Sequence, residues 1–199
     1  MKSLSVCGLL LLFASVCLGQ TPLKKTELTI ADREAWRKVL QWPDALEQQW
    51  QHSRTDKRSE AAGLNLYSLG QGNYLAAIEV AENAYQPRYV FMYYSESNPR
   101  ATVPGRLLKL KTYERDDDHA GTVSAKLTTE VEGIPTFDDA KKQLVLYTKG
   151  RGTLDCGALV RYRILPNRTI PTEARAHGCY DDYSLGITDP LRWKRIKRL

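Results

Sequence analysis

The sequence predicts a mainly β protein of the α+β class, in which an N-terminal helical segment precedes about eight antiparallel strands arranged in hairpins. Three observations support this prediction. Apolar residues recur at helical spacing over about 29–52. From Gly63 onward the period of the apolar residues changes to two, which is typical of strands. Short clusters of glycine, proline and asparagine separate the strand-like segments, as hairpin turns require.

The beginning of the chain predicts a cleavable signal peptide over 1–19. Lys2 supplies a positively charged start, residues 9–16 are almost continuously apolar, and Gly19 is a small residue at a suitable cleavage point. The apolar run is too short to cross a bilayer as a helix, which takes about 20 residues. We therefore expect a secreted or periplasmic protein whose mature part, 20–199, is a single β-rich domain.

The helical segment begins at Thr29, an N-cap residue with Asp32 three positions later, which is the spacing of a capping box. Pro43 interrupts the pattern, because proline lacks the N–H that a helix interior requires, so the segment is expected to form two helices. Three tryptophans of this segment are expected to pack into a core rather than to stack on a ligand. They are Trp36, Trp42 and Trp50.

Strands are predicted where β-branched or aromatic runs lie between turns. The run 89–94 is apolar or aromatic throughout and is expected to be a central strand, whereas 135–139 is expected to form a turn. Residues 52–62 and 114–121 are expected to be polar loops. The predicted strands are 64–69, 74–80, 89–94, 106–113, 123–131, 143–148, 158–165 and 170–176.

Two segments of the predicted strands resemble each other, LYSLGQG at 66–72 and LYTKGRG at 146–152. Both are typical of a strand that ends in a glycine turn. They indicate either two related β halves or convergence on the same hairpin chemistry.

Two of the four cysteines fall in the predicted signal peptide, which leaves Cys156 and Cys179. An even pair in an oxidising compartment favours a disulfide. A hairpin turn centred on Asn167 and Arg168 would place the two cysteines opposite each other. A turn centred on Pro166 and Asn167 would instead shift the register and lose that opposition.

No residue is assigned to catalysis, cofactor binding or metal binding. The chain contains no nucleophile elbow, dinucleotide loop or P-loop, and a disulfide would disable the cysteine thiols. The densest acidic cluster, 116–118, does not have the spacing of an EF-hand and is expected to be solvated. The same interpretation applies to 138–139 and 181–182. We therefore expect neither an enzyme nor a cofactor.

The overall charge is moderately positive, with 29 basic and 23 acidic residues in the whole chain. Loss of the signal peptide removes one basic residue, Lys2. Such a protein suits contact with anionic envelope surfaces such as phospholipid or acidic glycans. Export argues against nucleic acid as a partner, and no segment after the signal peptide is apolar enough to form a transmembrane helix.

The strongest local charge signal is the C-terminal segment, 192–199, which interleaves basic and apolar residues. This pattern is typical of contact with an anionic surface or an acidic partner. A last strand with solvated cations and a buried tryptophan would carry the same pattern. The residues predicted for anionic-surface contact are Arg192, Trp193, Lys194, Arg195, Lys197 and Arg198.

Glycines, cysteines and aromatic residues also form a pattern across most of the predicted mature chain. The pattern comprises Trp42-Pro43, Ala84-Tyr85-Gln86, Phe137-Asp138, Leu144, Gly150-Arg151-Gly152, Asp155-Cys156-Gly157, Tyr162, Glu173-Ala174-Arg175-Ala176, Cys179-Tyr180-Asp181 and Asp189-Pro190-Leu191-Arg192-Trp193. It resembles a family of exported bacterial proteins of unknown function. The resemblance implies a periplasmic setting and β architecture, but no activity and no functional residues. Members of that family often carry a second cysteine pair at positions that are Ala45 and Ala81 here.

Taken together, these observations predict a non-enzymatic binding or envelope-associated module, whose partner is an envelope protein or an anionic envelope surface. One alternative is an inhibitor or immunity protein that blocks an envelope hydrolase, with 114–121 as the docking loop. A looser resemblance to small periplasmic inhibitors of lysozyme accompanies this alternative. A second alternative is a carboxylate-dependent hydrolase, which would need two acidic side chains in one pocket.

Overall fold

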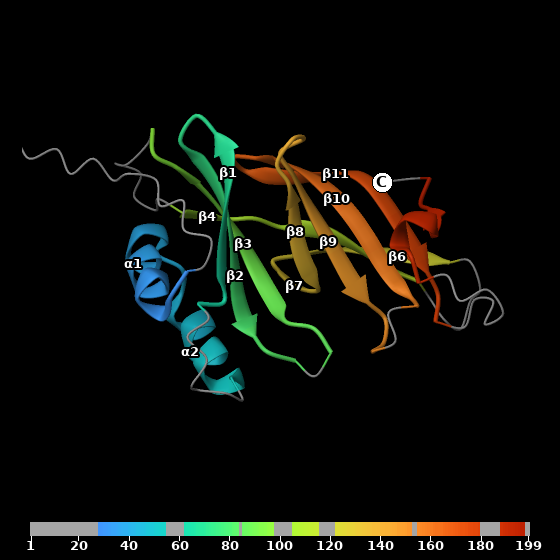
Figure 1. Ribbon diagram of the computed structural model, residues 1–199, viewed down its shortest axis with the longest axis horizontal. Helices are drawn as coiled ribbons and strands as arrows, with labels where there is room; N and C mark the ends of the chain where they lie inside the picture. The colour runs from blue at the N-terminus through green and yellow to red at the C-terminus, as the bar shows by residue number, and fades with distance from the viewer. Residues whose placement is uncertain are drawn as a thin grey trace, which may run out of the picture.

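Two helices precede a set of antiparallel sheets, so the predicted fold class is confirmed (Figure 1). The computed structural model describes residues 28–54, 62–83, 85–97, 105–115, 122–152, 155–179 and 188–197. The predicted signal peptide lies outside these residues. The helices are α1 (Ile30–Leu40), α2 (Asp44–Ser53) and the short 3-10 helix η1 (Pro190–Arg192). The strands are β1 (Leu64–Gly70), β2 (Asn73–Ala81), β3 (Arg88–Ser95), β4 (Gly105–Leu107), β5 (Leu110–Arg115), β6 (Val123–Thr128), β7 (Glu130–Glu132), β8 (Ile134–Asp138), β9 (Gln143–Lys149), β10 (Gly157–Leu165), β11 (Arg168–His177) and β12 (Lys194–Arg195).

The described strands form three sheets. The first has the order β1-β2-β3-β4, with β7 also paired to β3, and the second has the order β12-β11-β10-β9-β8. The third is the pair β5-β6. Helices α1 and α2 lie against one face of the first sheet, and the second sheet lies on its other side (Figure 1).

The first sheet buries side chains on both of its faces. In β2, Ala76 and Ile78 belong to the core beneath the helices, whereas Leu75 and Ala77 belong to the core shared with the second sheet. Successive side chains of a strand point to opposite faces, so a strand buried on both faces is apolar throughout. The same reasoning confirms that the apolar run around Phe91 forms a central strand.

The helical segment follows its sequence signals closely. The Thr29 backbone N–H donates to the Asp32 carboxylate at 2.8 Å, and the Asp32 N–H donates to the Thr29 hydroxyl at 3.3 Å, which completes the capping box. Helix α1 ends where Gln41 adopts a left-handed conformation, and Pro43 immediately precedes α2. All three tryptophans of this segment pack against the core cluster or are buried, as expected. They are Trp36, Trp42 and Trp50.

Two predicted strands are each divided between two sheets. The strand expected at 106–113 is β4 and β5, because the chain leaves the first sheet at Leu108, whose N–H donates to the Phe91 carbonyl at 2.8 Å. The strand expected at 123–131 is β6 and β7, separated by a bend at residue 129. The number of strands is therefore larger than the expected eight, since alternation continues across a change of sheet and does not reveal it.

The turn predicted at 135–139 is wrong, because these residues form most of strand β8. Asp138 pairs with Gln143 across a tight connection, so the turn comes later, at 139–142. Pro135 is tolerated because β8 is the edge strand of its sheet, where a missing N–H interrupts no ladder. The Phe137 ring stacks on Tyr67 of β1 with centroids 4.9 Å apart, which links the edges of two sheets.

The predicted disulfide joins Cys156 and Cys179, with their Cα atoms 4.8 Å apart. The hairpin turn is centred on Pro166 and Asn167. This is the turn for which the sequence predicts that Cys156 and Cys179 no longer lie opposite each other. Direct opposition is lost as expected, because Gly157 pairs with His177 and this register places Cys156 opposite residue 178. The register also shifts within the hairpin and leaves Thr172 without a partner in the ladder. This extra residue offsets half of the two-residue slip from the turn, and the remaining offset of one residue still allows the two cysteines to meet.

The two similar segments, 66–72 and 146–152, lead into different connections. The first ends in the tight turn at Gln71 and Gly72, whereas the second enters the longer connection that precedes Cys156. Their sequence resemblance is therefore not matched by a shared turn.

Candidate anion-binding face

The C-terminal segment lies against the second sheet and is held there by one buried side chain. Trp193 is 2% exposed, and its ring centroid lies 5.7 Å from that of Tyr147 and 6.0 Å from that of His177. The Arg175 guanidinium donates to the carbonyls of Leu191 at 2.6 Å and Trp193 at 3.2 Å. The segment is therefore docked, and Trp193 acts as its anchor.

Docking leaves the basic residues of this segment in solvent. Strand β12 pairs with the end of β11, with Arg195 opposite Arg175, and the Ile196 N–H donates to the Ala174 carbonyl at 2.8 Å. Of the residues predicted for surface contact, Trp193 faces inward, and Arg198 lies outside the described residues. The four exposed cations are here called the C-terminal ridge. They are Arg192, Lys194, Arg195 and Lys197.

Strand alternation sends a second group of cations to the outer face of this sheet. In β10, Val160, Tyr162 and Ile164 enter the core, so the residues between them, Arg161 and Arg163, point to the opposite face. The register with β11 and β12 places three more arginines on the same face. The five residues, here called the arginine face, are Arg161, Arg163, Arg168, Arg175 and Arg195.

The arginine face carries a net positive charge. Strands β8 to β12 contain two carboxylates, Asp138 and Glu173. Glu173 lies 3.3 Å from Nε of Arg161 and 2.7 Å from Nε of Arg175, and Asp138 lies 3.9 Å from Arg161. The hydrogen bond from Arg175, together with the charges of neighbouring arginines, lowers the pKa of Glu173 and keeps it ionised.

The remaining arginines of this face have exposed side chains. Arg163, Arg168 and Arg195 hold no side-chain ion pair or hydrogen bond within the part of the chain that the structure describes. Their guanidinium groups are therefore available to an anion from solvent. Arg195 also adds to the positive potential around Glu173.

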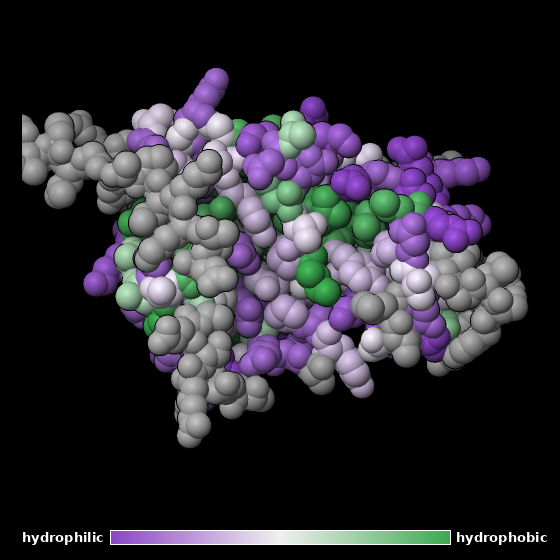
Figure 2. All heavy atoms as spheres, viewed as in Figure 1, coloured by the Kyte–Doolittle hydropathy of each residue, from purple (hydrophilic) through white to green (hydrophobic). Residues whose placement is uncertain are grey.

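An apolar strip crosses the same face. Val145 and Tyr147 of β9 are half-buried, and Tyr147 pairs with Leu159 of β10 and with Ile134 of β8. Figure 2 shows hydrophobic side chains over β9 to β11, bordered by hydrophilic ones. The face thus combines arginines with an apolar surface.

The sequence predicts the cations of the C-terminal ridge but not the arginine face. The five arginines are spread over three strands, and only the pairing register brings them together. The spacing of Arg161 and Arg163 shows that these two share a face of one strand. Their relation to Arg175 depends on the unpaired Thr172, which no local pattern indicates.

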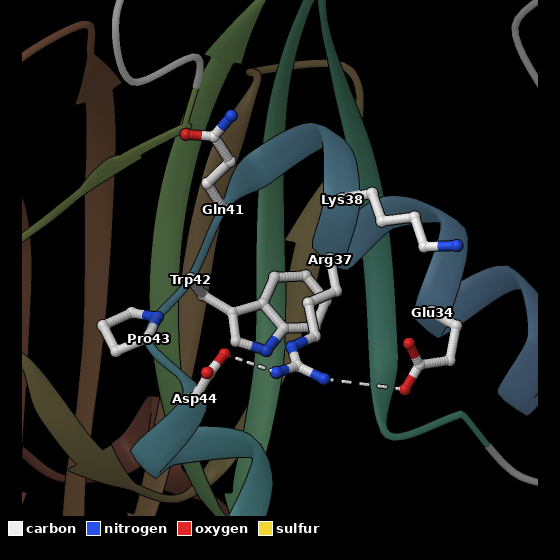
Figure 3. A pocket seen from close by; sticks show the side chains of 7 residues that line it. All are labelled: Glu34, Arg37, Lys38, Gln41, Trp42, Pro43 and Asp44. Atoms are coloured by element: carbon white, nitrogen blue, oxygen red, sulfur yellow. Dashed lines mark hydrogen bonds and ion pairs between the residues drawn. The ribbon is translucent and has the colours of Figure 1, made fainter.

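A hollow of about 540 Å³ lies at the elbow between α1 and α2 (Figure 3). Arg37 is the central cation there, and it contacts Asp44 at 2.5 Å and Glu34 at 3.8 Å. Lys38 points away from this group in Figure 3. The positive charges of Arg37 and Lys38 equal the negative charges of Glu34 and Asp44 in number. Because Arg37 is already paired with both carboxylates, the hollow attracts an anion less strongly than the arginine face does.

The most buried charged group, Arg33, has a structural role. Its guanidinium donates to Glu47 and to the carbonyls of Ala62, Gly63 and Glu79, at about 3 Å in each case. It also stacks over Trp50, with Cζ 3.8 Å from the ring centroid. All five N–H groups of the side chain have acceptors, which leaves none for a ligand.

Several further side chains of the types used in catalysis or metal binding are either engaged or lie outside the described residues. His52 Nδ1 lies 2.6 Å from the Gln48 carbonyl, and the Lys142 ammonium contacts Asp139. His119 and the clusters 116–118 and 181–182 lie outside the described residues. Within the described ranges, no group of three or more histidine, cysteine, aspartate or glutamate side chains could hold a metal ion. No helix of the same ranges is long and apolar enough to cross a membrane.

Comparison of the chain with protein-family models, with curated proteins and with solved structures found no match in any of the three.

Proposed function

We propose that this protein is an exported, non-enzymatic binding module that contacts an anionic envelope surface through the arginine face and the C-terminal ridge. The observation that carries the proposal is the docking of the C-terminal segment. Trp193 is buried beneath the segment while its cations are exposed beside the arginine face, with Arg195 common to both groups. Arg195 therefore joins the ridge to the arginine face.

Export is supported by the predicted signal peptide and by the disulfide between Cys156 and Cys179, which suits an oxidising compartment. The outer membrane face, the peptidoglycan layer and the cell surface all present anionic groups to such a protein. A positive surface on a folded domain raises its local concentration at these groups.

The ridge is expected to contribute a measurable part of the binding free energy. Each lysine or arginine close to an anionic membrane contributes about 1 kcal/mol. Removing three ridge cations should therefore weaken binding by about 3 kcal/mol, or roughly a hundredfold. Salt should weaken the binding of the unaltered protein as well, because exposed charges are screened.

The test is co-sedimentation of the exported protein with vesicles of phosphatidylglycerol and phosphatidylcholine, compared with phosphatidylcholine alone. The ridge variant carries Arg192→Gln, Lys194→Gln and Lys197→Gln. A control variant carries Lys38→Gln, Arg106→Gln and Lys126→Gln, which remove the same charge outside the proposed surface.

We expect the ridge variant to lose most of its binding to anionic vesicles and the control variant to keep most of it. Equal losses in the two variants would show that only net charge matters and would contradict the proposed surface. Absence of binding by the unaltered protein to every anionic surface tested would contradict the proposal as a whole.

The inhibitor hypothesis stays a prediction, because most of its docking loop lies outside the described residues. A pull-down from envelope extract tests it independently. Stoichiometric recovery of a single envelope hydrolase would favour inhibition over surface binding, and an assay of that hydrolase with the added protein would decide between them.

A further inference from the structure

The five arginines of the arginine face follow one another along the sheet. Arg163 and Arg161 are alternate residues of one strand and so lie about 7 Å apart. Arg168 is diagonal to Arg163, and Arg175 is diagonal to Arg161, at about 7–8 Å in each case. Arg195 lies directly opposite Arg175. The row therefore extends for roughly 20 Å along the strands.

On the face of the sheet that carries the row, every cation of β10, β11 and β12 is arginine rather than lysine, because Lys194 lies opposite Ala176 on the other face. Guanidinium is a planar fork that binds carboxylate, sulfate or phosphate through two parallel hydrogen bonds, whereas the lysine ammonium acts as a point charge. A row of such forks at regular spacing suits a ligand that presents discrete acidic groups in sequence.

Two members of the row are recessed and fixed. The side chains of Arg161 and Arg175 are only 22% and 25% exposed, and Glu173 holds both of them. A planar bilayer can touch protruding side chains but not recessed ones. Glu173 engages both of these arginines, and Arg175 also donates to the Leu191 and Trp193 carbonyls. A thin, extended polymer can follow the sheet surface over them and reach the three unengaged guanidinium groups, those of Arg163, Arg168 and Arg195.

The apolar strip beside the row supplies the second half of the surface. Val145 lies on the neighbouring strand and the exposed Ile134 on the strand beyond it, on the same face. Tyr147, which is in register with Leu159, already packs against Trp193. The apolar faces of sugar rings pack on side chains of this kind, because aromatic and aliphatic surfaces bury them without a polar cost. Acidic groups on one edge of the polymer can then meet the arginines.

From this arrangement we infer that the natural ligand is a linear acidic polysaccharide, bound along the arginine face with its acidic groups on the guanidinium forks. This inference rests on the proposed function and deepens it, since it names the class of anionic surface. The C-terminal ridge extends the positive potential at one end of the row through Arg195.

The experiment measures binding of the exported protein to polygalacturonate, which carries carboxylates, and to dextran sulfate, with neutral dextran and anionic vesicles beside them. The variant Arg163→Lys, Arg168→Lys and Arg195→Lys keeps the net charge and removes three forks. A control variant makes the same change at Arg37, Arg88 and Arg106, which lie outside the face.

We expect the unaltered protein to bind at least one acidic polysaccharide and not neutral dextran. The variant with three lysines on the face should bind that polysaccharide at least about tenfold more weakly, because a point charge replaces each bidentate contact. Its binding to vesicles should not change, and the control variant should match the unaltered protein.

A second measurement uses the unaltered protein alone, so it does not depend on how any variant folds. Affinity for oligogalacturonides should rise with length until the row of roughly 20 Å is filled, and then level off. Affinity that is independent of length would overturn the inference.

The outcomes separate this inference from the proposed function. Vesicle binding without polysaccharide binding, or equal polysaccharide binding by the lysine variant, would overturn the inference and leave surface binding in place. Absence of binding to both polysaccharides and vesicles would overturn the inference and the proposed function together.

Discussion

The substitution Trp193→Ala tests whether one buried side chain holds the C-terminal segment on the sheet. Trp193 is 2% exposed, and an aromatic side chain buries about 150–250 Å². At about 25 cal/mol per Å², this burial contributes roughly 4–6 kcal/mol, and tryptophan-to-alanine substitutions in cores cost about 3–5 kcal/mol. Among the described residues, the other attachments include the two-residue strand β12, a further backbone hydrogen bond from Ile196 and the bonds from Arg175. We therefore expect the segment to undock.

Limited digestion with trypsin is the assay, because the segment contains several cleavage sites. In the unaltered protein the docked backbone should resist cleavage after Arg195, whereas in the Trp193→Ala variant the same bond should be cut much faster. The free energy of unfolding should fall by no more than about 3–5 kcal/mol, since the segment can undock while the rest stays folded.

Trp36→Ala is the matched control, because Trp36 packs edge-on against Tyr94 under α1, with centroids 5.9 Å apart. It should lower stability without exposing the C-terminal segment. Equal trypsin resistance of the segment in the Trp193→Ala variant and the unaltered protein would refute the anchoring role.

Three further predictions concern the buried cation, the disulfide and the acid range. Arg33→Ala should lower the free energy of unfolding, measured in urea, by about 3–5 kcal/mol, because it leaves the Glu47 carboxylate buried without its partner. The control Arg37→Ala should lower it by less than about 1 kcal/mol, because Arg37 pairs with Asp44 at the surface. Similar losses in the two variants would contradict the role of Arg33. Reducing the disulfide, which spans 23 residues, should cost about 3 kcal/mol, measured by urea unfolding with and without reductant. The pKa of Glu173 is lowered in the folded state, so its stabilising contribution is present above the ordinary glutamate value of 4.5 and is lost as the pH falls through the lowered pKa. Unfolding midpoints from pH 7 downward should therefore fall less in Glu173→Gln than in the unaltered protein, and parallel curves would argue against this contribution.

The sequence by itself determined those parts of the fold that depend on interactions between residues close together in the chain. The capping box at Thr29 starts a helix wherever the chain places it, and the glycine turn at Gln71 and Gly72 closes a hairpin. The C-terminal segment was also visible as a set of cations around an apolar residue. Each of these features is set by interactions among residues close together in the chain.

Only the tertiary structure decided how distant segments meet. Leu108 leaves one sheet and Leu110 enters another without any break in alternation, and Pro135 lies in a strand because that strand is at an edge. Arg33, which lies on the apolar face of α1, is stable in the core only because three carbonyls and Glu47 converge on it from other elements.

The arginine face shows the same division. Alternation within β10 places Arg161 and Arg163 on one face, and that much follows from the sequence. Their alignment with Arg175 and Arg195 depends on the unpaired residue in β11 and on the burial of Trp193, which positions β12. The sequence determined which residues are cationic. The tertiary structure decided that they lie on one face, because the register between strands is selected by the packing of the whole core.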